Sequence, residues 1–186
     1  GSYLVNYFLD MNLAEVIKNT QWMRTISESI LQQDLENVDS KAIVAAFVIF
    51  YWSGAMIGRF IGAYLTKIIA PAKVLALFAT MAISLLAISM LTNGLVAMFS
   101  ILLVGLFNSI MFPTIFTFSL SGLGNYKPQA SGILCTAIVG GAIIPPLYGY
   151  FTDQFDFKPA LILMVLCYFY IFYFARKSDS YIKTNS

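Results

Sequence analysis

The stretch from Leu95 to Leu120 constrains the fold of this chain more than any other. Its 26 residues carry no charged side chain, and a helix of that length can cross a bilayer core of about 30 Å. Asn108 lies near its middle and Pro113 follows it. A carboxamide is costly in lipid and a proline leaves one backbone carbonyl without a donor, so we expect this helix to line a passage. The alternative is a kinked, packed helix whose Asn108 bonds a neighbouring helix.

Composition places the whole chain in the membrane. Apolar residues make up 59% of it and charged residues 11%, with a mean hydropathy of +0.79, whereas soluble domains have roughly 45–50% and 25%. The 186 residues suffice for about five or six helical crossings. The sequence has no histidine, which excludes a histidine proton relay and a histidine-based metal or catalytic site. We therefore predict an all-α, polytopic membrane protein, built as a six-helix bundle.

The first 40 residues divide into two parts. Residues 1–9 are apolar but too short to cross a bilayer as a helix, so we expect the chain to begin partway through a helix. Residues 10–40 hold six of the nine acidic residues, with apolar residues at roughly helical spacing. This segment is predicted to lie outside the hydrocarbon, as an interfacial amphipathic helix or hairpin. A solvated connecting loop and a partner-binding surface are the alternatives.

Five further helices are predicted, over residues 41–66, 74–91, 95–120, 131–151 and 159–175, before a polar tail at 176–186. The helices over 74–91 and 159–175 resemble lipid-facing supports, and the second is rich in aromatic residues. The helix over 131–151 cannot be regular, because it contains glycines and a proline pair, among them Gly140, Gly141 and Pro145.

The helix over 41–66 carries two features of its own. Gly54, Gly58 and Gly62 recur every four residues, which predicts a groove of bare backbone for close helix packing. Arg59 is the only charged residue well inside a predicted span. It either extends to the nearby basic loop at the membrane surface or pairs with helix carbonyls or a carboxylate in a gate.

Charge predicts the orientation. If the six segments alternate and the tail is cytoplasmic, that side carries seven basic residues and one acidic residue, and the other side four basic and eight acidic residues. The positive-inside rule favours this arrangement, with residues 10–40 as a periplasmic loop.

The polar and aromatic residues within the spans indicate the kind of solute. Amides bond hydroxyl groups and aromatic rings stack on the C–H faces of sugars, whereas no ring of charges suited to an ion is present. We therefore expect a neutral, hydroxyl-rich substrate, bound by Asn6, Tyr7, Trp52, Asn108, Phe112 and Thr136. Gating and structural roles are expected for Gly58, Arg59, Gly62, Pro113, Gly140, Gly141 and Pro145.

The sequence also resembles a known family over nearly its whole length. The runs GSYLVNYF (1–8), YWSGAMIGRFIGAYL (51–65), GLFNSIMFPTIFTFSLSGLG (105–124) and SGILCTAIVGGAIIPPLYGYFTD (131–153) are similar to the C-terminal half of the fucose permease and glucose/galactose transporter family. That family belongs to the major facilitator superfamily. The resemblance implies a twelve-helix transporter whose helices 7–12 are represented here, with an N-terminal half as partner.

The resemblance also implies a function. The family moves hexoses across the bacterial inner membrane by alternating access, with a proton or sodium ion as coupling ion and no other cofactor. Arg59, with Gly58, Gly62 and Lys67, looks like a degenerate copy of the superfamily's cytoplasmic gate motif, although the usual acidic residue is missing. No Asp or Glu lies in a predicted span, so a coupling carboxylate is not expected in this chain.

Three alternatives remain open from the sequence. The chain could serve a facilitator or exporter of another neutral metabolite or drug on the same fold. A membrane-embedded enzyme would need clustered reactive side chains, and only Asp153 and Asp156 lie together beside a span. A scaffold or receptor descended from a transporter would use residues 10–40 as its binding surface. The residues indicate neither an enzyme nor a nucleic-acid partner.

Overall fold

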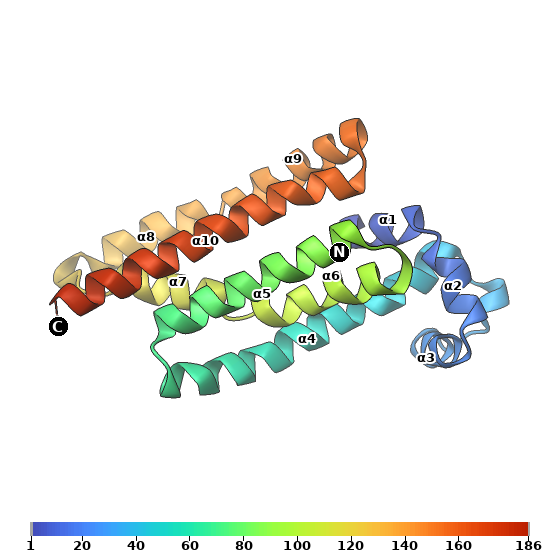
Figure 1. The fold of residues 1–186 in the computed structure, drawn as a ribbon, viewed down its shortest axis with the longest axis horizontal. Coiled ribbons are helices and arrows are strands. Elements are labelled where there is room, and N and C mark those ends of the chain that lie inside the picture. The colour runs from blue at the N-terminus through green and yellow to red at the C-terminus, as the bar shows by residue number, and fades with distance from the viewer. Residues whose placement is uncertain (1, 186) are drawn as a thin grey trace.

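The computed structural model describes residues 2–185, and side-chain burial for residues 4–179. Within residues 2–185 the secondary structure is helical, without strands. Figure 1 shows long helices running side by side, with short helices α2 and α3 at one end and the C-terminus at the other. We call these the hairpin end and the tail end. The prediction of an all-α membrane protein is confirmed.

The helices occupy these ranges: α1 Ser2–Asp10, α2 Leu13–Asn19, α3 Gln21–Leu31, η1 Leu35–Asn37, α4 Ser40–Ile68, α5 Pro71–Leu91, α6 Gly94–Asn108, α7 Met111–Leu120, η2 Gly124–Tyr126, α8 Lys127–Ala137, α9 Gly140–Phe155 and α10 Phe157–Asn185. Five segments are long and apolar enough to cross a membrane: Ser40–Ile68, Pro71–Leu91, Gly94–Leu120, Gly124–Phe155 and Phe157–Asp179. The predicted segment 10–40 contains α2, α3 and η1. The predicted tail 176–186 continues α10 as helix to Asn185; residues 1 and 186 lie outside the described residues.

The span Gly94–Leu120 is interrupted between α6 and α7. The break falls at Ser109 and Ile110, where Ile110 has φ −103° and ψ −6°. Pro113 lies four residues after Ser109 and has no N–H to donate to its carbonyl, so the helical hydrogen-bond ladder stops there. The sequence feature that predicted an irregular helix therefore coincides with the observed interruption.

The span Gly124–Phe155 is interrupted between α8 and α9. The break lies at Ile138 and Val139, ahead of Pro145 and Pro146, which remain inside α9. The amides at 141 and 142 donate to the carbonyls at 138 and 139, both at 2.8 Å, a spacing typical of a tight 3₁₀ turn. The prolines deprive the carbonyls at 141 and 142 of their usual donors, which weakens the helix just after this turn.

The glycines of α4 lie against the interrupted span. A Cβ added at Gly58 would collide with the Leu106 carbonyl oxygen and lie 2.7 Å from the Ser109 hydroxyl. A Cβ added at Gly62 would collide with the Ile110 side chain. The four-residue spacing of these glycines thus presents bare backbone to α6 and to Ser109 and Ile110, the two residues that follow it.

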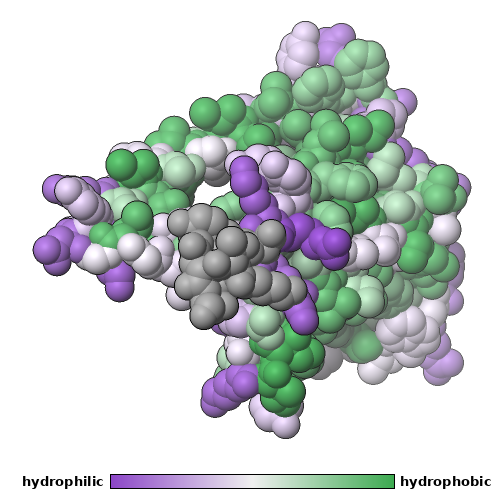
Figure 2. Space-filling view, turned by 60° about the vertical axis from the view of Figure 1, so that its left-hand side comes forward, coloured by the Kyte–Doolittle hydropathy of each residue, from purple (hydrophilic) through white to green (hydrophobic). Residues whose placement is uncertain are grey.

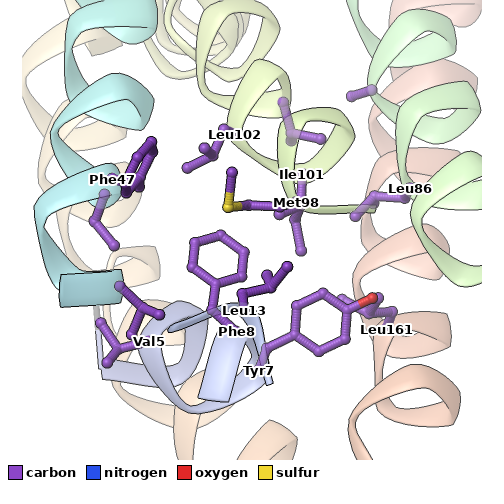
Figure 3. Close-up of a cluster of buried hydrophobic side chains, with 14 of the residues drawn as sticks. Val5, Tyr7, Phe8, Leu13, Phe47, Leu86, Met98, Ile101, Leu102 and Leu161 are labelled. Carbon is purple, nitrogen blue, oxygen red and sulfur yellow. The ribbon is translucent and has the colours of Figure 1, made fainter. Parts of the chain in front are cut away.

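A buried hydrophobic cluster near the hairpin end (Figure 3) includes Phe8, Leu13, Phe47 and Met98, which are fully buried. Elsewhere much of the surface is apolar, with Phe60 and Ile133 more than two thirds exposed. Figure 2 views the bundle obliquely: hydrophobic residues cover much of the visible surface, and hydrophilic residues form smaller patches among them. An apolar exterior of this kind suits a bilayer.

Candidate functional site

A cavity of about 300 Å³ opens between α1, α4 and α6 on one side and α9 and α10 on the other. This volume is at the lower end of the ~300–1,000 Å³ typical of small-molecule sites. Its aliphatic lining includes Val48, Ile101 and Leu161. Its aromatic lining consists of Tyr7, Tyr51, Trp52, Tyr148 and Tyr168. Apolar walls with a few polar groups are the usual make-up of a small-molecule site.

One polar pair at the cavity consists of Tyr51, which lines it, and Asn108, which does not. The Asn108 Nδ2 donates a hydrogen bond to the Tyr51 hydroxyl at 3.3 Å, and both groups are partly or fully accessible. Gly105 allows this pairing, because a Cβ there would lie 2.5 Å from the Tyr51 carbonyl oxygen. The close approach of α6 to α4 at Gly105 brings Asn108, less than one turn later, to the tyrosine.

Trp52 adds an aromatic wall beside this pair. Its ring meets the Tyr51 ring edge-on, with the two ring centroids 5.7 Å apart. Trp52 is 64% exposed and lines the cavity. Tyr51 and Trp52 thus offer a hydroxyl and an indole face to whatever occupies the cavity, and the exposed Asn108 amide is bonded to that hydroxyl.

Tyr7 lines the same cavity but uses its hydroxyl within the protein. The hydroxyl lies 3.2 Å from the Ser89 carbonyl oxygen and 3.1 Å from the Ser89 hydroxyl. Figure 3 shows Tyr7 extending toward the helices that carry Leu86 and Leu161. Its neighbour Asn6 is exposed and does not line the cavity. The ring of Tyr7, rather than its hydroxyl, is therefore available to a ligand.

Phe112 and Thr136 lie elsewhere. Phe112 lines a second, apolar hollow of about 380 Å³ between α7 and the interrupted pair α8 and α9, together with Phe116 and Leu134. The Thr136 hydroxyl donates to the Ile133 carbonyl oxygen of its own helix at 2.7 Å and does not line the first cavity. Of the six predicted contact residues, Tyr7 and Trp52 line the first cavity and Asn108 bonds to Tyr51 of its lining. The binding role of all six stays a prediction.

The predicted gating residues also separate into groups. Gly58 and Gly62 are buried in the α4–α6 contact, and Pro113 and Pro145 lie in or next to the interrupted segments. Arg59 is exposed, and within the described part of the chain it forms no ion pair or hydrogen bond. Gly140 and Gly141 have open space around them. The gating roles of these residues remain predictions.

Sequence reasoning missed three tyrosines of the cavity. Tyr51 precedes Trp52 in the chain, but no local pattern connects it to its hydrogen-bond partner Asn108, which is 57 residues away. Tyr148 is hidden within the glycine- and proline-rich helix, and it is buried. Tyr168 belongs to the predicted lipid-facing aromatic helix. In the structure that helix presents Tyr170 and Tyr173 outward and turns Tyr168 toward the cavity.

No family model matches the chain. It is 41% identical over 174 residues to the glucose/galactose transporter of Brucella abortus, which covers 94% of this chain and 37% of that protein. It is 45% identical over 150 residues to the putative glucose/galactose transporter of Helicobacter pylori, covering 78% and 37%. The L-fucose-proton symporter of Escherichia coli is 37% identical over 139 residues, covering 72% and 32%.

A solved structure gives the same relationship. The crystal structure of the major facilitator superfamily transporter FucP in the outward conformation superposes with a TM-score of 0.73 and 27% sequence identity. The superposition covers 95% of this chain and 42% of FucP, in its C-terminal half. The chain thus spans about two fifths of the length of the relatives it matches. These relatives are transporters rather than enzymes.

Proposed function

We propose that this chain forms the sugar-contacting C-terminal part of a hexose transporter. It is a homologue of the glucose/galactose transporters and L-fucose-proton symporters, and it shares the fold of the C-terminal half of a major facilitator superfamily transporter. The observation that carries the proposal is the cavity lined by Tyr51 and Trp52, with the exposed Asn108 amide hydrogen-bonded to the Tyr51 hydroxyl. An amide and a hydroxyl can exchange their mutual hydrogen bond for bonds to sugar hydroxyls, and the indole can stack on a sugar ring.

We propose alternating access as the mode of transport, coupled to a proton or a sodium ion. The cavity is lined without any Asp or Glu side chain, so the coupling cation would have to bind elsewhere in the transporter. An N-terminal half would supply the facing wall of the passage. The exposed face of α4, which includes Trp52 and Arg59, is the part of this chain that such a half would meet.

We also propose that the membrane is the bacterial inner membrane, with the tail end in the cytoplasm. The support is charge. The tail end carries Lys67, Lys73 and Lys127, whereas the hairpin end is predominantly acidic. The positive-inside rule assigns the more basic end to the cytoplasm. The second candidate function is a facilitator or exporter of another neutral metabolite, which the largely apolar cavity lining would equally suit.

The experiment is uptake of labelled glucose, galactose, mannose and fucose by cells or vesicles that contain the full-length transporter. It is run with and without a proton or sodium gradient, beside Asn108→Ala and, as control at an exposed site away from the cavity, Asn19→Ala. Saturable, gradient-dependent hexose uptake that Asn108→Ala reduces and Asn19→Ala retains supports the proposal. Saturable uptake that no gradient affects indicates the facilitator. No uptake of any hexose by correctly inserted protein contradicts the sugar assignment.

A further inference from the structure

We propose that helix α3 lies on the membrane surface at the hairpin end and holds a flank of apolar side chains, Trp22, Ile26 and Ile30, against phospholipid. The proposal requires only that the bundle spans a membrane, and it does not depend on which solute is transported.

The side chains of α3 divide into three strips along the helix. Met23 and Ser27 are buried against the rest of the protein. Trp22, Ile26 and Ile30 recur every four residues and therefore share one side of the helix. Trp22 is 50% exposed, Ile30 is 38% exposed and Ile26 is half-buried, so this apolar flank has no complete cover within the described chain.

The opposite flank of α3 is polar and is satisfied by its own ion pairs. The Arg24 Nε donates to Glu28 at 2.7 Å, and its NH2 group lies 3.2 Å from Asp34. These charges are partly exposed. A helix with one apolar and one charged flank is suited to a boundary between hydrocarbon and water.

The direction of α3 fits that boundary. Figure 1 shows α3 nearly end-on, whereas α4, α5 and α10 run across the picture. Its axis therefore runs across the direction of the spanning helices rather than along it. If those helices cross the bilayer, α3 lies roughly parallel to the membrane plane.

Trp22 fixes which way the apolar flank faces. Its ring stacks on Phe99 of α6, with ring centroids 6.1 Å apart and an angle of 21° between the rings. Phe99 shares one side of α6 with Val96 and Leu103, which are 55% and 49% exposed. That side is turned away from Ile101, which lines the cavity. The Trp22 ring thus continues an exposed apolar surface of a spanning helix on its outer side.

The depth of this contact also fits the interface. Phe99 follows the first residue of α6, Gly94, by five residues, which is about 7 Å along the helix at 1.5 Å per residue. That places Trp22 near the end of the span, where tryptophan is enriched in membrane proteins. Residues 10–40, which include α3, hold more acidic than basic residues. The attachment of α3 therefore comes from apolar contact rather than from attraction to anionic headgroups.

The first test uses the emission of Trp22 in the full-length transporter reconstituted into phosphatidylcholine bilayers. The Trp22 contribution is the difference between the unaltered protein and Trp22→Phe. We expect this difference emission to be quenched more by lipids brominated near the headgroup end of the acyl chain than by lipids brominated near its terminus. High salt should leave the quenching unchanged. No quenching by either lipid would overturn the proposal.

The second test does not rely on tryptophan. A nitroxide label is placed at Ile26→Cys or, as matched control on the polar flank, at Thr25→Cys, after Cys135, Cys167 and any other cysteine of the transporter have been replaced. In bilayers the label at 26 should collide readily with oxygen and poorly with a water-soluble nickel complex, and the label at 25 should show the reverse. A label at 26 as accessible to nickel as that at 25 would show a solvated loop and overturn the proposal. A label at 26 shielded from both reagents would show a protein partner instead, and would overturn it equally.

Discussion

The two interrupted spans, Gly94–Leu120 and Gly124–Phe155, each contain a break followed by proline, but the two breaks have opposite surroundings. Of the most apolar stretch of the first, 56% of the residues are buried, whereas none are in the second. The first break rests on the glycines of α4, with Ser109 and Ile110 in contact distance of any added Cβ. The second break, at Ile138 and Val139, has Gly140 and Gly141 beside it in open space.

This difference indicates that the two breaks are stabilised in different ways. A break enclosed by protein is held in one shape by the contacts around it. A break without cover in the described chain takes its shape from the lipid or protein that surrounds it. We therefore expect the first span to tolerate little change, and the second to be the more adaptable part of the passage.

Gly58→Ala should have the largest effect on this comparison. The added Cβ would collide with the backbone carbonyl of Leu106 and with Ser109, and backbone cannot give way as a side chain can. Overpacking typically costs 1–3 kcal/mol, so we expect destabilisation of about 3 kcal/mol. The measurement is the apparent midpoint of thermal unfolding in detergent, together with the yield of folded protein.

Gly141→Ala is the matched control on the second span. Nothing lies within 4 Å of a Cβ there, and replacing glycine by alanine in a helix stabilises it by roughly 0.5–1 kcal/mol. We expect an unchanged or slightly raised midpoint. If Gly58→Ala were as well tolerated as Gly141→Ala, the tight contact between α4 and α6 would be wrong.

Lys158→Met should have the next largest effect, at the hairpin end. The Lys158 ammonium donates to the Thr92 carbonyl oxygen at 2.8 Å and to the Asn93 side chain at 2.5 Å, and so ties the start of α10 to the end of α5. Hydrogen bonds to charged groups contribute about 1.5–3 kcal/mol, and the exposure of Asn93 favours the low end of this range. Thermal unfolding should show the loss, whereas the control Lys41→Met, at an exposed site, should not. Equal unfolding midpoints for the two variants would show that the hydrogen bonds of Lys158 to Thr92 and Asn93 do not stabilise the protein.

Tyr7→Phe should have a smaller effect on stability. It removes the hydroxyl that bonds Ser89 but keeps the ring in the cavity wall. The Ser89 hydroxyl still donates to the Ala97 carbonyl oxygen, so no buried donor is left without a partner. We expect a loss of about 1 kcal/mol in thermal unfolding, with hexose binding retained. A complete loss of binding would show that the Tyr7 hydroxyl contacts the sugar.

Much of the fold followed from the sequence, because the signals were local. Uncharged runs of helical length, the four-residue glycine spacing and Pro113 are all readable along the chain, and they correspond to spans, to the α4–α6 contact and to the first break. The second break was less well located. Pro145 and Pro146 drew attention, but the interruption lies several residues earlier, at Ile138 and Val139, where the glycines follow.

The cavity was harder to foresee, because it depends on contacts between distant segments. Asn108 was singled out as a polar residue at mid-span, but only the close approach at Gly105 identifies Tyr51 as its partner. Composition likewise assigned Tyr168 to a lipid-facing helix, although the rotation of α10 brings it to the cavity. Residue type predicted the chemistry of the site, and helix packing decided which residues share it.

The central claim, that the sugar is held at the packed interrupted span, can be tested by equilibrium binding of labelled hexose to the purified full-length transporter. Asn108→Ala is compared with Thr136→Val, its counterpart in the other interrupted span. Loss of one or two hydrogen bonds, each contributing about 0.5–1.5 kcal/mol, predicts at least about twofold weaker binding for Asn108→Ala. Thr136→Val should bind as the unaltered protein does. Unchanged binding in Asn108→Ala, or weaker binding in Thr136→Val alone, would contradict this account.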